Sequence, residues 1–365
     1  DQATSSVAVA NFEGDGKAEI AIADYTTPNV LVLSNRCSVS GLTIHGRVVD
    51  LPTTGGISSV TMKLTGTRTA STITDNGGNY SFTGLPPGNY ALTPERPGAE
   101  ITPANRSFTL TNNQKIDFDG SRKATAVSAA SYNGQQIAQG SIVALFGLEM
   151  TSRTQLATQQ PLPTSLGGMV VAFKNESAAR EYNGRLFFVS PNQINVLVPL
   201  ELSDGPTTFR VFAPNNYLEP TTIGAVQLDL VAPGLFAADA SGRGLAAAVA
   251  LRVKADGSQV YEPITRFDPA QNKFVAIPID VSNPAEQLFL LAFGTGISGR
   301  LGTSDFQAKI GGDPVEIAFV GPQGEFAGLD QLNLRLPRSL AGRGNVDVVL
   351  TVGGKPTNTV QINIR

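Results

Sequence analysis

The chain has 365 residues and a formal net charge of −3, from 27 basic and 30 acidic residues, and only 16% of its residues are charged. This balance excludes the basic surface by which proteins bind nucleic acid or dock on anionic membranes. Glycine (38 residues) and proline (23 residues) are abundant, which favours many short strands joined by tight turns. At roughly 100–200 residues per domain, the length predicts two to four domains.

The chain has a single cysteine, Cys37, and a single histidine, His45. One thiol makes no disulfide within these residues, so Cys37 is either a free, small apolar residue or the partner of a cysteine in another chain or upstream of Asp1. The first residue is Asp1 rather than methionine, so we expect a mature or trimmed chain. The longest apolar runs, such as QLFLLAFG at 287–294, are far shorter than a membrane span.

Residues 1–36 predict three strands, VAVA, EIAIA and NVLVL, with the acidic loop NFEGDGKAE between the first two. This pattern resembles a single FG-GAP or VCBS-type repeat, the unit of a β-propeller blade. Oxygen ligands on alternate residues converge on one hard cation, so we expect one Ca²⁺ site here. Its ligands would be three side chains, one backbone carbonyl and a closing carboxylate, from Asn11, Glu13, Asp15, Lys17 and Glu19 respectively. The alternative is an acidic turn whose carboxylates are solvated.

A single blade cannot bury both faces of its sheet, because propellers contain about four to eight blades. Three arrangements stay open for residues 1–36. The segment docks on the chain's own next module, it is the last blade of a longer propeller, or its exposed strand edges pair with a neighbouring subunit.

Residues 42–119 follow a linker at 36–41 and predict a β-sandwich. DNGG at 75–78 supplies the positive φ of a tight turn, and LPPG at 85–88 ends one strand and turns into the next. GRVVD, ITDNGGNYSFTGLPPGNYAL and IDFD resemble the carboxypeptidase-regulatory-like, transthyretin-like domain, which implies a spacer or presentation module. Lys63 alternates with apolar neighbours and should point outward, so we predict no isopeptide bond from it.

A second linker is expected at 120–126, and an internal repeat follows it. GSIVALFGLEMTSR at 140–153 matches EQLFLLAFGTGISGR at 286–300, and SPNQINVLVPLEL at 190–202 matches LDQLNLRLPRSL at 329–340. The two copies predict two Ig-like sandwiches, 126–231 and 232–365. The second carries an additional hairpin within 251–285.

These repeated motifs, together with LPTSLGGMVV and APGLF, resemble a C-terminal domain family of large secreted Acidobacteria proteins of the Solibacter type. The resemblance implies secretion and brings no established activity with it. In that family the domain often follows propeller repeats and transthyretin-like modules, which is the order found here.

Two recurring amide pairs and the histidine are the most conspicuous polar residues. Gln193 and Asn195 share one strand face, as do Gln331 and Asn333, so they form either a glycan-binding ladder or amides that satisfy backbone groups of nearby loops. The latter is favoured. His45 lacks a second histidine or a thiol partner, so we expect a structural role for it.

The sequence therefore predicts an all-β chain: a propeller-type repeat, a transthyretin-like sandwich and two Ig-like sandwiches. We expect a secreted, non-enzymatic structural or adhesive cell-surface protein, with copies of itself or other surface proteins as partners and a filament as one form of assembly. The alternatives are a polysaccharide-binding module and the accessory region of a larger secreted enzyme. Motifs for catalysis by serine, cysteine or zinc, and phosphate-binding loops, are absent from the sequence.

Overall fold

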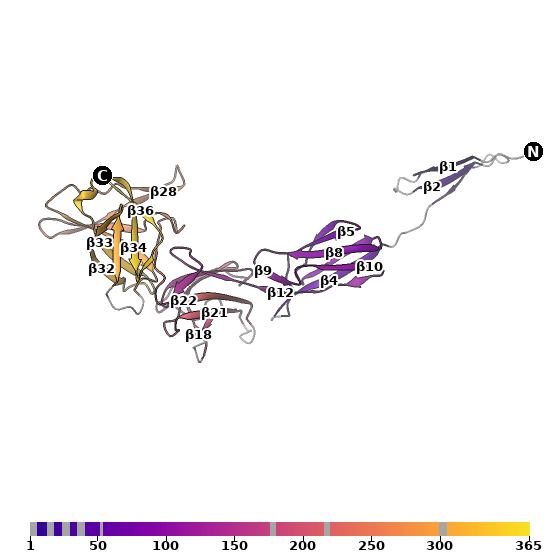
Figure 1. Cartoon of the computed structure of the whole chain (residues 1–365), viewed down its shortest axis with the longest axis horizontal. Coiled ribbons are helices and arrows are strands. Elements are labelled where there is room, and N and C mark those ends of the chain that lie inside the picture. The colour runs from indigo at the N-terminus through magenta and orange to yellow at the C-terminus, as the bar shows by residue number, and fades with distance from the viewer. Residues whose placement is uncertain are drawn as a thin grey trace, which may run out of the picture.

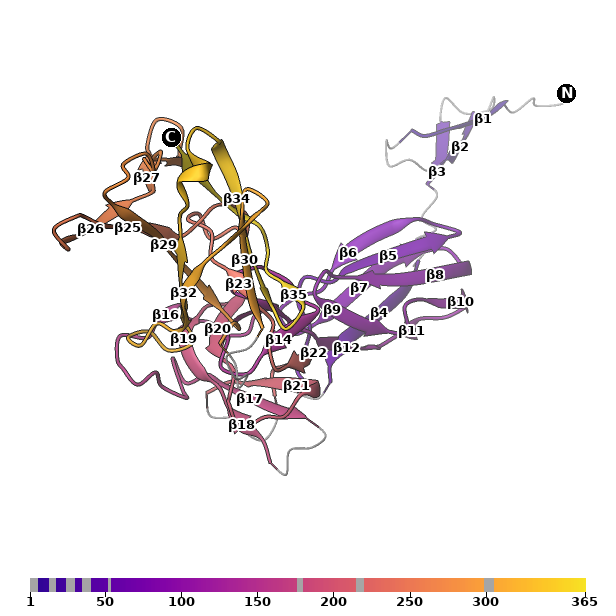
Figure 2. The same cartoon turned by 60° about the vertical axis from the view of Figure 1, so that its left-hand side comes forward.

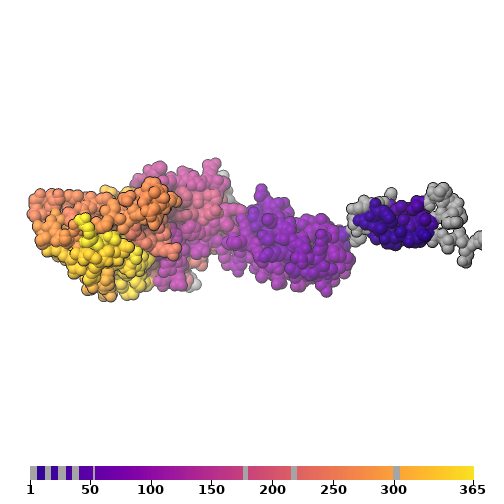
Figure 3. All heavy atoms as spheres, turned by 90° about the horizontal axis from the view of Figure 1, so that it is seen from above, coloured from indigo at the N-terminus to yellow at the C-terminus, as the bar shows by residue number. Residues whose placement is uncertain are grey.

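The computed structural model describes residues 6–12, 18–23, 30–34, 41–51, 54–175, 180–214, 220–298 and 305–365. These residues form β-strands, turns and one short 3₁₀ helix, η1 (Arg338–Leu340), so the predicted all-β class is confirmed. The sheets follow one another along the long axis, with the N-terminal strands at one end and the C-terminal lobe at the other (Figures 1 and 3). No helix in the described part of the chain is long and apolar enough to cross a membrane.

The first three strands form an antiparallel sheet in the order β1-β2-β3. Their bounds are β1 (Ser6–Ala10), β2 (Glu19–Ala23) and β3 (Val30–Leu33). The three strands expected from the apolar alternation are therefore present. Their relationship to a propeller blade stays a prediction.

The next module is a β-sandwich with sheet orders β10-β8-β5-β6 and β11-β4-β12-β9, and β7 pairs with β4. Its strands are β4 (Leu42–Asp50), β5 (Thr61–Gly66), β6 (Ala70–Ile73), β7 (Asn79–Leu85), β8 (Gly88–Glu95), β9 (Ala99–Thr102), β10 (Arg106–Leu110), β11 (Gln114–Lys115) and β12 (Phe118–Arg122).

The turns and faces of this module follow the sequence pattern. Gly78 has a φ of +78° in the predicted DNGG turn, where a Cβ would lie 2.4 Å from the Val48 carbonyl oxygen. Met62 and Leu64 are fully buried, while Lys63 points outward and pairs with Glu95 at 2.6 Å. The predicted orientation of Lys63 is thus confirmed.

Two further sandwiches complete the chain. The first lobe contains β13 (Thr125–Ser128), β14 (Gln136–Ala138), β15 (Ile142–Phe146), β16 (Gln155–Leu156), β17 (Val170–Asn175), β18 (Tyr182–Asn183), β19 (Arg185–Val189), β20 (Gln193–Leu197), β21 (Gly205–Phe212) and β22 (Thr222–Asp229). Its sheet orders are β13-β15-β20-β19-β16 and β14-β22-β21-β17-β18.

The second lobe contains β23 (Gly234–Leu235), β24 (Gly244–Leu245), β25 (Ala248–Val253), β26 (Gln259–Pro263), β27 (Thr265–Asp268), β28 (Lys273–Ala276), β29 (Gln287–Thr295), β30 (Phe306–Ile310), β31 (Asp313–Val315), β32 (Ile317–Pro322), β33 (Asp330–Arg335), β34 (Gly344–Val352), β35 (Lys355–Pro356) and β36 (Val360–Ile364). Its main sheets are β26-β25-β29-β33-β32 and β24-β36-β34-β30-β31. The additional hairpin predicted in 251–285 is confirmed as β27–β28, and β26 also adds an outer strand to the main sheet beside β25; β26 and β27 lie on one side of the lobe in Figure 2.

The internal repeat is visible in the strand register. β15 pairs with β20 so that Phe146 lies opposite Gln193, and β29 pairs with β33 so that Phe293 lies opposite Gln331. The neighbouring pairs β19–β20 and β32–β33 each carry a register shift at the corresponding place. The two lobes are therefore two copies of one strand arrangement, each with its own apolar core.

The expectation of a linker at 120–126 has to be corrected. Residues up to Arg122 belong to β12, β13 begins at Thr125, and the Ala124 N–H donates to the Ile223 carbonyl oxygen at 3.1 Å. The backbone between the modules thus continues in hydrogen-bonded, extended form, because β22 supplies a partner that the local sequence does not reveal.

Candidate functional site

The predicted calcium loop is described only at its two ends. Glu19 begins β2 with 1% of its surface exposed, and its Oε2 accepts a hydrogen bond from the Phe12 N–H at 2.7 Å. Asn11 is exposed at the end of β1. The hairpin therefore brings Asn11 and Glu19 to the same end of the sheet, while Glu13, Asp15 and Lys17 lie outside the described residues. Within the described ranges, no group of three or more His, Cys, Asp or Glu side chains could hold a metal ion.

One face of the N-terminal sheet is a continuous aliphatic surface, which we call the aliphatic face. The register aligns two rows across the strands, and these rows are Val7–Ile22–Leu31 and Val9–Ile20–Leu33. Except for the half-buried Ile22, these side chains are 41–65% exposed. A contiguous exposed apolar patch of this kind marks a surface that contacts another molecule or another part of the chain. The aliphatic face is therefore a candidate contact surface.

In each of the two repeated amide pairs, the glutamine and the asparagine form a hydrogen bond with each other. Gln193 Nε2 donates to Asn195 Oδ1 at 2.8 Å, and Gln331 Nε2 donates to Asn333 Oδ1 at 2.8 Å. This differs from the expectation that the amides satisfy backbone groups of nearby loops. The i to i+2 spacing puts both side chains on one face of a strand, where they are close enough to bond directly. The recurrence thus preserves a local structural contact.

A cluster of charged side chains joins the sandwich formed by β4–β12 to the first lobe, and we call it the junction clamp. Glu149 Oε1 accepts hydrogen bonds from Arg96 at 2.8 Å and Ser58 at 3.0 Å, and Glu149 Oε2 lies 3.2 Å from Arg122. Arg122 also approaches the buried Asp50 at 3.6 Å. Partial burial raises the pKa of Glu149, but the hydrogen bonds and the two arginine charges outweigh it and hold that pKa below its usual value.

The two lobes are joined by a part-buried hydrogen bond and an ion pair. The Ile142 N–H of the first lobe donates to Thr295 Oγ1 of the second at 2.8 Å, and within the second lobe Thr295 Oγ1 donates to the Gly328 carbonyl oxygen at 2.7 Å. Thr295 is fully buried, and Lys355 pairs with Asp229 at 2.6 Å across the same boundary. Together with the junction clamp, these contacts connect the three sandwiches into an extended body.

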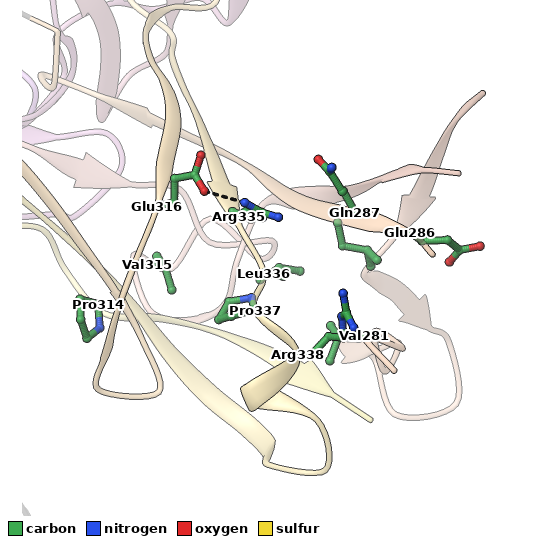
Figure 4. A pocket seen from close by; sticks show the side chains of 11 residues that line it. Val281, Glu286, Gln287, Pro314, Val315, Glu316, Arg335, Leu336, Pro337 and Arg338 are labelled. Carbon is green, nitrogen blue, oxygen red and sulfur yellow. Dashed lines mark hydrogen bonds and ion pairs between the residues drawn. The ribbon is translucent and has the colours of Figure 1, made fainter. Parts of the chain in front are cut away.

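A cleft of about 360 Å³ opens in the second lobe between β29, β31, β33 and η1 (Figure 4). Its charged groups are engaged within the fold. Arg335 pairs with Glu316 at 2.9 Å, Glu286 pairs with Arg252 at 2.6 Å, and Arg338 donates to a backbone carbonyl at 3.1 Å. The side chains lining this described cleft include no serine, cysteine or histidine. Its groups therefore serve the lobe's own structure.

The single histidine and the single cysteine belong to none of the sites above. His45 is exposed on β4, in register with Ser81 on one neighbouring strand and Lys115 on the other. Cys37 lies outside the described residues. The aliphatic face and the junction clamp were missed at the sequence level. The apolar residues of VAVA, EIAIA and NVLVL are a signal for the former, but no local pattern marks Glu149.

Residues 43–119 match the carboxypeptidase regulatory-like domain, so that part of the predicted organisation is confirmed. A search of curated proteins gives no match.

The solved structures to which the chain is similar include three proteins at 10% sequence identity. The TIE protein of Bacillus anthracis has a TM-score of 0.24, with 80% of this chain and 52% of that chain covered. The major pilin subunit of Bacillus cereus has a TM-score of 0.23, with 82% and 96% covered. A candidate carbohydrate-binding protein from Bacteroides uniformis has a TM-score of 0.21, with 52% and 100% covered. The match spans about half the length of the Bacillus anthracis protein, and TM-scores this low carry no argument about fold or function.

Proposed function

We propose that this chain is a secreted, non-enzymatic structural protein of the cell surface, which assembles with copies of itself through its N-terminal sheet. The observation that carries the proposal is the aliphatic face. Two rows of Val, Ile and Leu side chains lie largely open to solvent on this sheet, and covering them supplies the driving force for association.

The strand edges of the same sheet support the proposal. In the order β1-β2-β3, both outer strands keep one edge without a neighbour within the described sheet, and such edges pair with strands of other chains. The sheet stands at one end of an elongated molecule (Figure 1). A head-to-tail contact between this end and the far end of another copy builds an open filament when its rotation does not close a ring, and the filament is the form of assembly that we propose.

The three sandwiches give the proposed filament a stiff body. The junction clamp, the Ile142–Thr295 hydrogen bond and the Lys355–Asp229 ion pair hold successive modules together, and β12 leads directly into the first lobe. The resemblance of residues 126–365 to a C-terminal domain family of secreted proteins supports a location outside the cell. The proposal also includes a Ca²⁺ ion in the loop before Glu19, which would fix the β1–β2 hairpin.

Negative-stain imaging of the purified chain, with Ca²⁺ and with a chelator, tests the proposal. We expect rods joined end to end in Ca²⁺, and shorter assemblies after chelation. Single rods at every protein concentration in Ca²⁺ would refute self-assembly, and filaments that are indifferent to chelation would refute the role given to the metal.

A further inference from the structure

The β27–β28 hairpin forms one wall of a second cleft in the C-terminal lobe. The cleft has a volume of about 490 Å³, within the usual range of ligand sites. Phe267, Asn272, Lys273 and Phe274 come from the hairpin, and Leu245 and Asp239 come from the segment around β24. This hairpin is a separate two-stranded sheet that has no counterpart among the described strands of the first lobe.

Two phenylalanines supply the apolar wall. Phe267 and Phe274 are direct cross-strand partners, so both lie on the same face of the hairpin. Their ring centroids are 5.5 Å apart at an interplanar angle of 71°, an edge-to-face contact that fixes the rings relative to each other. Phe267 nevertheless keeps 48% of its surface exposed. The cleft thus presents an ordered aromatic surface to solvent.

Polar groups stand at the rim of this aromatic surface. Asp239 Oδ1 accepts hydrogen bonds from the Ser241 hydroxyl at 2.6 Å and from the Ser241 N–H at 3.0 Å, which orients the carboxylate. The Ser241 hydroxyl bond is also the main cause of a pKa of Asp239 below its usual value. Lys273 and Asn272 lie on the opposite wall, and no ion pair of the described residues includes Asp239 or Lys273.

We propose that this cleft binds carbohydrate. A pyranose ring has one face of weakly positive C–H groups, which packs on the negative face of an aromatic ring, and a rim of hydroxyls that donate to carboxylate and amide oxygens and accept from ammonium groups. The combination of Phe267 with Asp239, Asn272 and Lys273 offers both surfaces at once. An apolar peptide side chain would use the rings but would desolvate the rim charges without compensation. The site is separate from the aliphatic face and does not depend on assembly.

The test uses the full chain with insoluble cellulose and chitin in a sedimentation assay, and with soluble xylan in affinity gel electrophoresis. We expect retention by at least one of these polysaccharides. Phe267→Ala should weaken retention about tenfold, the factor that corresponds to the loss of one aromatic contact of about 1.4 kcal/mol. Asp239→Asn, which lies outside the hairpin and keeps an acceptor for Ser241, should also weaken it. Phe319→Ala, which truncates a phenylalanine of the same lobe that is 42% exposed, is the matched control and should leave retention unchanged.

Thermal unfolding of each variant separates loss of binding from loss of the fold. Retention by none of the three polysaccharides, or equal losses for Phe267→Ala and Phe319→Ala, would overturn the proposal. If the chain bound a denatured protein such as reduced α-lactalbumin and none of the polysaccharides, the cleft would be a site for apolar peptide side chains, and the proposal would be overturned. Leu31→Ser, on the aliphatic face, should leave retention unchanged, so a failure of self-assembly and a failure of this site are distinguishable.

Discussion

Adjacent residues of β3 provide a sharp test of the aliphatic face. Leu31 belongs to that face and is 59% exposed, whereas its neighbour Val30 is 64% exposed on the opposite face. Full burial of such a side chain contributes about 1.5–3 kcal/mol, so covering the open part of Leu31 contributes about 0.9–1.8 kcal/mol. Leu31→Ser should therefore weaken self-association about 4- to 20-fold. Adding Val9→Ser, which removes a side chain that is 65% exposed, should weaken it about 20- to 500-fold.

Sedimentation velocity over a range of protein concentrations measures this effect as a shift of the association midpoint. Val30→Ser is the matched control, since it makes a similar change on the same strand and should shift the midpoint little. Circular dichroism of each variant establishes that the three sandwiches are intact. Equal shifts for Leu31→Ser and Val30→Ser would refute the assignment of the contact to one face.

Three further predictions concern the junction, the second lobe and the acidic loop. The pKa of Glu149 is lower in the folded chain than the ordinary 4.5, so its contribution to the junction should be complete above pH 4.5 and lost as the pH falls through the folded value. Loss of this contribution should loosen the junction in acid, and Glu149→Gln should loosen it in the same way at pH 7, as measured by small-angle X-ray scattering. Identical scattering profiles of Glu149→Gln and the unmodified chain at pH 7 would contradict this. Arg252→Met leaves Glu286, which is 17% exposed, without this ion pair and should lower the free energy of unfolding of the second lobe by about 1–3 kcal/mol, whereas Arg335→Met, at an exposed pair with Glu316, should cost at most about 1 kcal/mol by denaturant titration. Calorimetric titration should find one Ca²⁺ site in the loop between β1 and β2, and a flat titration would argue for a solvated acidic turn.

Local patterns predicted the strands and the repeat well, for a physical reason. The matched motifs around Phe146 and Phe293 place the same residue types at the same strand positions, and the register then pairs them with Gln193 and Gln331. Alternation with period two likewise placed Lys63 on the outer face. Such predictions succeed because strand geometry assigns each side chain to a face without reference to distant elements.

Contacts between distant segments could not be predicted in this way. Glu149 meets Ser58, which is 91 residues away, only because two modules pack together. The GSRKATA segment resembles a linker by composition, yet β22 captures its backbone at Ala124. The cleft at Phe267 requires two segments to face each other, and neither segment alone carries a binding motif.

Light scattering of the unmodified chain in Ca²⁺, across a wide range of protein concentrations, tests the central claim most directly. Self-assembly through the N-terminal sheet predicts an average mass that exceeds the 38.2 kDa of one chain and rises steadily with concentration. A mass of 38.2 kDa at every concentration, measured on folded protein, would contradict it.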